Sequence, residues 1–120
     1  MKILIAEDEP LMLKTLELRL RKDGHEVITA CDGRQAMEKF SVCDPDLIIT
    51  DIMMPFATGL EVLGVVRKRT DKKIPVILLS AMGQENVIME AFKLGADDYI
   101  TKPFSPNELS MRVRRFMPPI

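Results

Sequence analysis

Five polar side chains could perform chemistry together, although they lie far apart along the chain. Three are the acids Glu7, Asp8 and Asp51, and the others are Ser80 and Lys102. Clustered carboxylates resist ionising together unless a cation joins them. Mg²⁺ suits such oxygen ligands and usually takes one or two protein carboxylates together with phosphate oxygens. A lysine and a hydroxyl would receive further phosphate oxygens, so these residue types indicate a phosphoryl group bridged to Mg²⁺ and carried covalently by Asp51.

These side chains can meet only if strands bring them to one edge of a sheet. Short apolar runs, typical of strands buried on both faces, precede each part of the set. In a parallel sheet the carboxyl ends of all strands open onto the same edge. The strands expected from these runs are 2–6, 25–29, 46–50, 75–80 and 98–101. The first is followed by acids, the third by Asp51 and the fifth by Lys102, whereas the fourth ends in Ser80.

Helical patterns fill the intervals between these strands. The expected helices cover 10–24, a segment from Gly33 through Phe40, a segment opened by Thr58-Gly59, 84–94, and a last one through Phe116. Ser105 and Glu108 resemble a capping box at the start of the last helix. The fivefold strand–helix alternation with short connections predicts a single α/β domain, with a parallel sheet covered by helices on both faces.

Composition restricts the class of protein. The 120 residues are 47% hydrophobic and 29% charged, which is ordinary for one globular domain. The apolar runs are too short to cross a membrane and acids interrupt the N-terminal one, so we expect no membrane contact and a cytoplasmic location. The net charge of −1 argues against direct nucleic-acid binding by this domain. Cys31 and Cys43 lack metal-ligand spacing and are expected to be free thiols.

Four motifs together resemble those of bacterial response-regulator receiver domains. They are Ile3-Leu-Ile-Ala-Glu-Asp-Glu9, Asp51-Ile-Met-Met-Pro55 with Gly59, Ser80-Ala81, and Gly95-Ala-Asp-Asp-Tyr-Ile-Thr-Lys-Pro-Phe104. The resemblance covers essentially the whole chain. It implies a flavodoxin-like, doubly wound sheet in the order 2-1-3-4-5. It also implies a receiver over 1–117, followed at 118–120 by a tail or the start of a linker to an absent output domain.

The resemblance implies a role for each residue of the predicted site. Asp51 would accept a phosphoryl group from a phosphohistidine of a sensor kinase or a phosphotransfer protein. Lys102 would pair with the phosphoryl group, and the peptide bond that follows it, to Pro103, would be cis. Ser80 would hydrogen-bond a phosphoryl oxygen, and Tyr99 would act as an aromatic switch that swings inward.

The same resemblance implies the Mg²⁺ ligands. Asp8 would bind the ion directly, Glu7 through water, and Asp51 and the backbone carbonyl of Met53 would complete the protein ligands. The protein would then be a phosphorylation switch, with no independent turnover substrate, rather than an enzyme.

The sequence departs from the family pattern near the phosphoacceptor. Phe56-Ala57-Thr58 lacks the acid that often precedes the following glycine, so the geometry of this loop is open. Ser80 stands where threonine is also common. Met53 and Met82 lie two residues after the phosphoacceptor and the switch hydroxyl, where the family sets the lifetime of the phosphoryl group. Since a thioether orients an attacking water poorly, we expect slow spontaneous dephosphorylation.

The last third of the chain also resembles receivers that precede a winged-helix DNA-binding domain. In those receivers the fourth helix, fifth strand and fifth helix form a face that pairs two copies. Side chains that could supply ion pairs across a homodimer are Lys93, Asp97, Asp98, Glu108, Arg112 and Arg115. The alternative is solvated surface charge, with the arginines of 112–115 complementing a helix C-terminus.

Each predicted site residue also has a simpler explanation. The acids of 7–9 could complement a helix N-terminus, Ser80 could be a turn hydroxyl, Tyr99 a half-buried strand residue and Lys102 a surface cation. Three other functions fit less well. A purely structural receiver that is not phosphorylated is disfavoured by the intact set of acids, hydroxyl and lysine. An aspartate-nucleophile phosphohydrolase needs a second acid where Met53 stands. A flavin-binding protein needs a phosphate-cradling loop after the first strand, where this chain is acidic.

Overall fold

The computed structural model describes residues 1–118, in which five strands and five helices alternate. The strands are β1 (Lys2–Ala6), β2 (Glu26–Ala30), β3 (Leu47–Asp51), β4 (Val76–Ser80) and β5 (Asp98–Thr101). The helices are α1 (Pro10–Lys22), α2 (Gly33–Cys43), α3 (Gly59–Arg67), α4 (Glu85–Lys93) and α5 (Pro106–Arg114). All strand pairs are parallel and the order is β2-β1-β3-β4-β5. The α/β class and the flavodoxin-like strand order are both confirmed.

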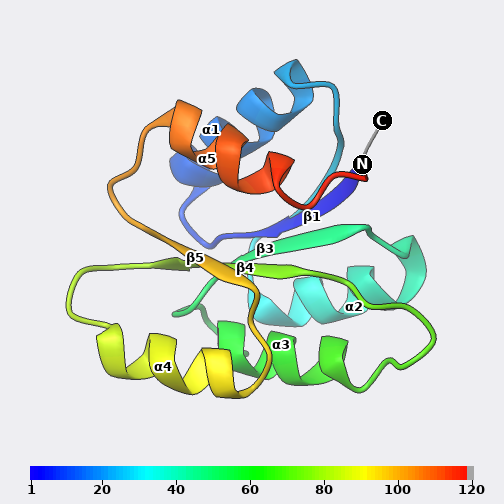
Figure 1. Ribbon diagram of the computed structural model, residues 1–120, viewed down its shortest axis with the longest axis vertical. Coiled ribbons are helices and arrows are strands. Elements are labelled where there is room, and N and C mark those ends of the chain that lie inside the picture. The colour runs from blue at the N-terminus through cyan, green and yellow to red at the C-terminus, as the bar shows by residue number, and fades with distance from the viewer. Residues whose placement is uncertain (119–120) are drawn as a thin grey trace.

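The molecule has three layers, with the sheet in the middle. Figure 1 shows α1 and α5 on one face of the sheet and α2, α3 and α4 on the other. The central strands β3 and β4 are buried along their whole length, which explains their uninterrupted apolar runs. Successive side chains point to opposite faces: Ile3 and Ile5 join the core under α1 and α5, whereas Leu4 joins the core under the other helices.

Element boundaries differ from the sequence-based expectation by one or two residues at several ends. Asp51 is the last residue of β3 rather than the residue after it, since it keeps register with Leu79 of β4. Pro75, which has no N–H to donate, lies outside β4. Phe116 lies beyond the end of α5 but still packs on the core, as its spacing suggested.

Capping explains two helix starts. Ser105 accepts a hydrogen bond from the Glu108 N–H at 3.1 Å, which is one half of the expected capping box. The complete reciprocal box lies at the start of α3, between Thr58 and Glu61. Thr58 thus caps α3 without the acid that often precedes Gly59 in the family, which shows how this loop enters the helix.

Two further expectations concern the state of the cysteines and the length of apolar segments. Cys31 is exposed, Cys43 is partly buried, and both are free thiols as predicted. Within residues 1–118, no helix combines the length and apolar character needed to cross a bilayer.

Candidate functional site

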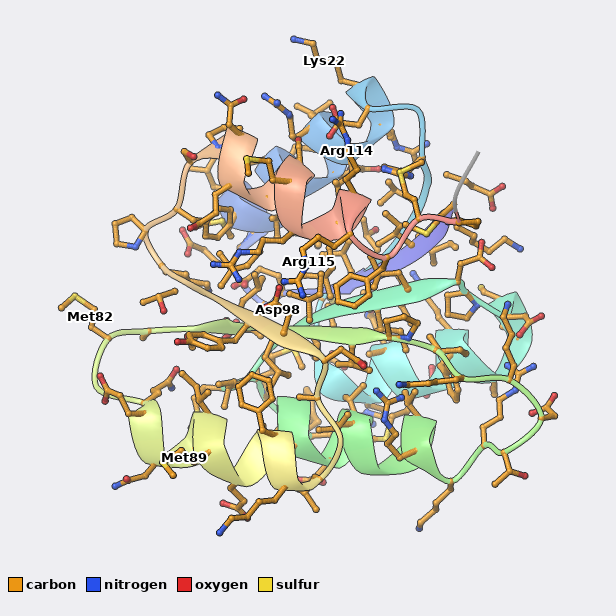
Figure 2. All side chains as sticks on the ribbon, in the orientation of Figure 1. Lys22, Met82, Met89, Asp98, Arg114 and Arg115 are labelled. Carbon is orange, nitrogen blue, oxygen red and sulfur yellow. The ribbon has the colours of Figure 1, made fainter. Side chains whose placement is uncertain are left out.

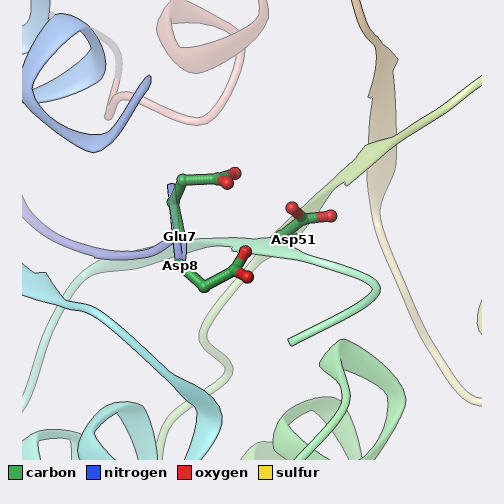
Figure 3. Close-up of side chains that lie close together, drawn as sticks. All are labelled: Glu7, Asp8 and Asp51. Atoms are coloured by element: carbon green, nitrogen blue, oxygen red, sulfur yellow. The ribbon is translucent and has the colours of Figure 1, made fainter. Parts of the chain in front are cut away.

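Three carboxylates converge at the carboxyl edge of the sheet. Glu7 follows β1 directly, Asp8 is the next residue, and Asp51 ends β3. One carboxylate oxygen from each lies within 4.8 Å of the others, and Figure 3 shows the three groups gathered around a common space. Glu7 and Asp51 are buried whereas Asp8 is exposed, so the cluster is open on one side. Hard oxygen donors with open positions suit Mg²⁺, which retains several waters.

Lys102 ties this cluster together. Its Nζ donates to Oε2 of Glu7 at 2.9 Å and to Oδ2 of Asp51 at 2.8 Å, across 95 and 51 residues of sequence. Its backbone N–H donates to the Ser80 carbonyl at 2.7 Å, which places it at the end of β5 beside β4. The bond from Lys102 to Pro103 is cis, as the resemblance implied. Lys102 is therefore part of the site and not a solvated surface cation.

The protonation of the cluster reflects its burial. Burial, together with the negative charge of Asp51, raises the pKa of Glu7 from 4.5 to about 7, against the opposing effect of Lys102. Burial also disfavours the charged ammonium of Lys102, but its hydrogen bonds to Asp51 and Glu7 prevail and raise its pKa. A single ammonium therefore does not fully compensate the acids, and a divalent cation fits this donor set on charge as well as on ligand type.

Ser80, at the end of β4, and Tyr99, in β5, are linked through the backbone of β5. Ser80 ends β4, is fully buried, and its hydroxyl donates to the Ile100 carbonyl at 3.5 Å. Tyr99 precedes Ile100 and is partly exposed, and its ring forms a T-shaped pair with that of Phe92 at a centroid distance of 5.8 Å. The Ser80 hydroxyl is thus engaged with the strand that carries the tyrosine.

Met53 and Met82 are among the most exposed apolar side chains, at 60% and 82%. Each follows a site residue by two positions, in the loops after β3 and β4, and Figure 2 shows Met82 at the tip of its loop. Exposed thioethers in these loops are consistent with the sequence-based reading that neither side chain binds an attacking water well.

Five of the six charged residues expected on a dimer face have partners within this chain. Asp98 is buried, and its carboxylate accepts from Arg112 at 2.9 Å and Arg115 at 3.0 Å. Figure 2 shows Asp98 and Arg115 together between β5 and α5. Glu108 lies 4.0 Å from Arg112, and Lys93 is exposed at the end of α4. Sequence reasoning did not foresee the clamp around Asp98, because its partners lie 14 and 17 residues away on a different element.

Asp97, the sixth of these residues, also has partners within the chain, and they include one that the sequence did not single out. Arg67, at the end of α3, donates to its carboxylate at 2.6 Å and to the carbonyls of Gly95 and Ile74. Lys73 lies 3.6 Å from the same carboxylate. No local signal in the sequence distinguishes Arg67 from the neighbouring cations Lys68 and Arg69.

Comparison with known proteins gives consistent similarities. The family model described as response regulator receiver domain matches residues 3–114. The "probable transcriptional regulator ycf27" of Galdieria sulphuraria is 47% identical over 94% of this chain and 44% of that protein. The alkaline phosphatase synthesis transcriptional regulatory protein PhoP of Bacillus subtilis is 40% identical over 97% of this chain and 48% of that protein. The chain therefore spans less than half the length of these curated relatives.

Solved structures agree with the fold. The receiver domain of the Francisella response regulator 1452 is 35% identical, with a TM-score of 0.87 over 96% of this chain and 94% of that one. The chemotaxis protein CheY4 of Vibrio cholerae is 31% identical, with a TM-score of 0.89 over 97% of this chain and 98% of that one.

Proposed function

This chain belongs to the response regulator receiver domain family, and from that premise we propose that Asp51 is its phosphoacceptor. Members of this family are phosphoacceptor switches of two-component systems rather than conventional enzymes. The donor in our proposal is a phosphohistidine of a sensor kinase or phosphotransfer protein. The observation that carries the assignment is the Lys102 ammonium, which is bound at once to Asp51 and to the buried Glu7.

The proposed transfer uses one carboxylate oxygen of Asp51 as the nucleophile. That oxygen attacks phosphorus, the phosphorus–nitrogen bond breaks, and its electron pair returns to the imidazole nitrogen of the donor. The product is an acyl phosphate on Asp51. Lys102 already lies 2.8 Å from Oδ2 of Asp51, so a short movement of its flexible stem would let it pair with a phosphoryl oxygen.

Receiver domains generally use Mg²⁺ at an acidic site. We propose that Asp8, Asp51 and the Met53 carbonyl hold the ion here, with Glu7 acting through a bound water. When bound, Mg²⁺ would neutralise part of the negative charge shared by the acids and the incoming phosphoryl group. The burial of Glu7 supports this arrangement, because its negative charge then needs a nearby cation.

Signal output in this proposal starts at Ser80. The Ser80 hydroxyl would leave the Ile100 carbonyl and bind a phosphoryl oxygen. Tyr99, which is adjacent to Ile100 and partly exposed, would then move inward. The new charge on Asp51 would thereby change the preferred state of the α4-β5-α5 surface.

The partners and the larger protein belong to the same proposal. We place the receiver at 1–117 and assign 118–120, of which 119–120 lie outside the described residues, to a linker toward a DNA-binding output domain. The transcriptional regulators that this chain resembles are about twice its length, which supports such a domain. A homodimer through the α4-β5-α5 face and a cytoplasmic location complete the proposal, and direct contact with nucleic acid is left to the output domain.

Intact-mass measurement after incubation with acetyl phosphate and Mg²⁺ tests the proposal. Wild type should gain the mass of one phosphoryl group, which hydroxylamine removes, and Asp51→Asn should gain none. Asp71→Asn, which changes an exposed aspartate outside the cluster, should behave like wild type. Phosphorylation of Asp51→Asn, or none of wild type, contradicts the assignment of Asp51.

A further inference from the structure

The loop between β3 and α3 contains a strained turn centred on Phe56. The Ala57 N–H donates to the Pro55 carbonyl at 2.8 Å, and Phe56 between them has a φ of 71°. A hydrogen bond between residues two apart around a positive φ defines the rare, strained form of the γ-turn. Positive φ is unfavourable for a side chain as bulky as phenylalanine. The surroundings must therefore hold this residue in place.

Both ends of the loop are held by backbone hydrogen bonds. The Ile52 N–H donates to the Leu79 carbonyl of β4 at 3.1 Å, and the Gly59 N–H donates to the Ile52 carbonyl at 2.8 Å. These contacts fix where the loop leaves β3 and where it enters α3. They lie at the base of the loop and do not reach Phe56 at its apex.

The apex is held by a side chain from α2. Phe56 is 72% exposed, so burial does not immobilise its ring, but the Arg34 guanidinium lies over it, 4.2 Å from the centroid. Gly33 brings α2 close enough for this contact. Its N–H donates to the Pro55 carbonyl at 3.4 Å, and a Cβ at this position would overlap the Ala57 carbonyl.

We propose that Arg34 and Phe56 form a positioning pair that holds the loop over 52–58 in its strained turn and so sets the affinity of the acidic site for Mg²⁺. The proposal deepens the proposed function and rests on it, because this loop carries the Met53 carbonyl that we assign as a ligand. Stacking of Arg34 on the ring favours the strained turn over relaxed loop conformations. Loss of the stack lets the loop relax, and the carbonyl then leaves its ligand position.

Amide hydrogen exchange on the metal-free 120-residue chain tests the positioning role without any reaction. Arg34→Met and Phe56→Ala should each increase exchange of the Ala57 N–H about tenfold, since this amide closes the turn. Arg34→Lys keeps the cation and Phe56→Tyr keeps the aromatic ring, so exchange of the Ala57 N–H in both variants should stay within about twofold of wild type. Arg114→Met, which removes an exposed arginine from α5, is the matched control.

A glycine at position 56 separates the effect of strain from the effect of the ring. Phe56→Ala keeps the unfavourable positive φ and loses the ring, whereas Phe56→Gly loses the ring but makes that φ acceptable. Phe56→Gly should therefore increase Ala57 exchange less than Phe56→Ala does. The opposite order overturns the proposal.

Calorimetric titration with Mg²⁺ then links the turn to the site. Arg34→Met and Phe56→Ala should each raise the Mg²⁺ dissociation constant about fivefold, and the double variant no further, because the two side chains act as one unit. The proposal is overturned if Arg34→Met and Phe56→Ala leave either Ala57 exchange or Mg²⁺ affinity unchanged. It is also overturned if their losses of Mg²⁺ affinity add in the double variant, or if these losses correlate with the melting temperature instead of with Ala57 exchange. If wild type binds no Mg²⁺, the metal site of the proposed function is refuted. The exchange data would still test whether Arg34 and Phe56 hold the turn.

Discussion

Glu7 is the residue of the site whose environment is least favourable to its charge. It is 1% exposed, faces Asp51, and shares the single ammonium of Lys102 with it. A carboxylate in this position gains most when a divalent cation joins the cluster. The raised pKa of Glu7 thus reflects an unfavourable environment for its charge, which a Mg²⁺ ion at the proposed site would relieve.

The pKa of Glu7 predicts how the stability of metal-free protein depends on pH. A folded-state pKa of about 7, above the ordinary 4.5, stabilises the folded protein fully below pH 4.5, and this contribution disappears as the pH rises through 7. Glu7→Gln removes the charge that causes the loss. In EDTA it should leave the melting temperature nearly unchanged at pH 5 and raise it by a few degrees at pH 8.

Thermal unfolding followed by circular dichroism measures this effect, with the exposed Glu26→Gln as the control. Added Mg²⁺ should reverse the order at pH 8, since it stabilises wild type and binds the variant less well. An equal shift of Glu7→Gln at both pH values is incompatible with this account.

Met53 and Met82 predict a long-lived phosphoryl group. Neither thioether orients a hydrolytic water, so phosphorylated protein in Mg²⁺ buffer should decay over minutes or longer. Met53→Asn supplies a side chain that can hold the water, and decay should accelerate by about tenfold or more. Intact mass against time gives both rates, and Met89→Asn on exposed α4 is the control. Loss of the wild-type phosphoryl group within seconds would refute the reading.

At the scale of elements, Arg67 connects three segments. From the end of α3 it reaches the carbonyl of Ile74 before β4, the carbonyl of Gly95 after α4, and the carboxylate of Asp97 before β5. Asp97 in turn accepts from the backbone N–H of Val76 at 2.8 Å. One guanidinium therefore fixes the chain where it leaves α4 and enters the last strand.

Removing this guanidinium should destabilise the fold. Arg67→Met keeps much of the apolar stem but removes the side-chain donor to the carbonyls of Ile74 and Gly95 and the arginine partner of the largely buried Asp97 carboxylate. We expect a loss of about 2–3 kcal/mol in the free energy of unfolding. Urea denaturation measures it, and Lys68→Met, at the exposed neighbouring position, should change it by less than about 0.5 kcal/mol. Equal stability of the two variants excludes the connecting role.

At the scale of the whole molecule, the charges of the α4-β5-α5 face are engaged within one chain. Arg112 and Arg115 both bind the buried Asp98. Pairing of two copies through this face therefore has to exchange these contacts or use charges that remain available, such as that of Lys93. Phosphorylation, through the proposed inward movement of Tyr99, is the event that we expect to shift this balance.

Light scattering tests this dimer. Unphosphorylated protein should have the monomer mass, and phosphorylated protein should approach twice that mass at tens of micromolar. Lys93→Glu should weaken association about tenfold or more by placing an acid where the face needs a cation. Lys22→Glu makes the same charge change at the distant end of α1, as Figure 2 shows, and should leave association unaltered. A phosphorylated protein that stays monomeric rejects the dimer proposal.

The amino-acid sequence was sufficient for the α/β class and for placing the predicted site residues at one edge of the sheet. Buried strands are marked by apolar runs, and a parallel sheet sends every strand's carboxyl end to one edge. Linear position alone was therefore enough to assign the site residues to one edge of the sheet: Asp51, Ser80, Lys102 and the acids that follow β1. The strand order itself came from family resemblance, because strand–helix alternation permits several orders.

Tertiary structure alone decided which side chains meet. Three contacts depend on packing between elements that are distant in sequence. Lys102 joins Glu7 to Asp51, Asp98 binds two arginines of its own chain, and Arg34 stacks on Phe56. Local propensity and periodicity encode the direction in which a residue faces. They do not encode the contacts between side chains, which depend on helix placement, on rotamers and on the burial that makes an unpaired charge costly.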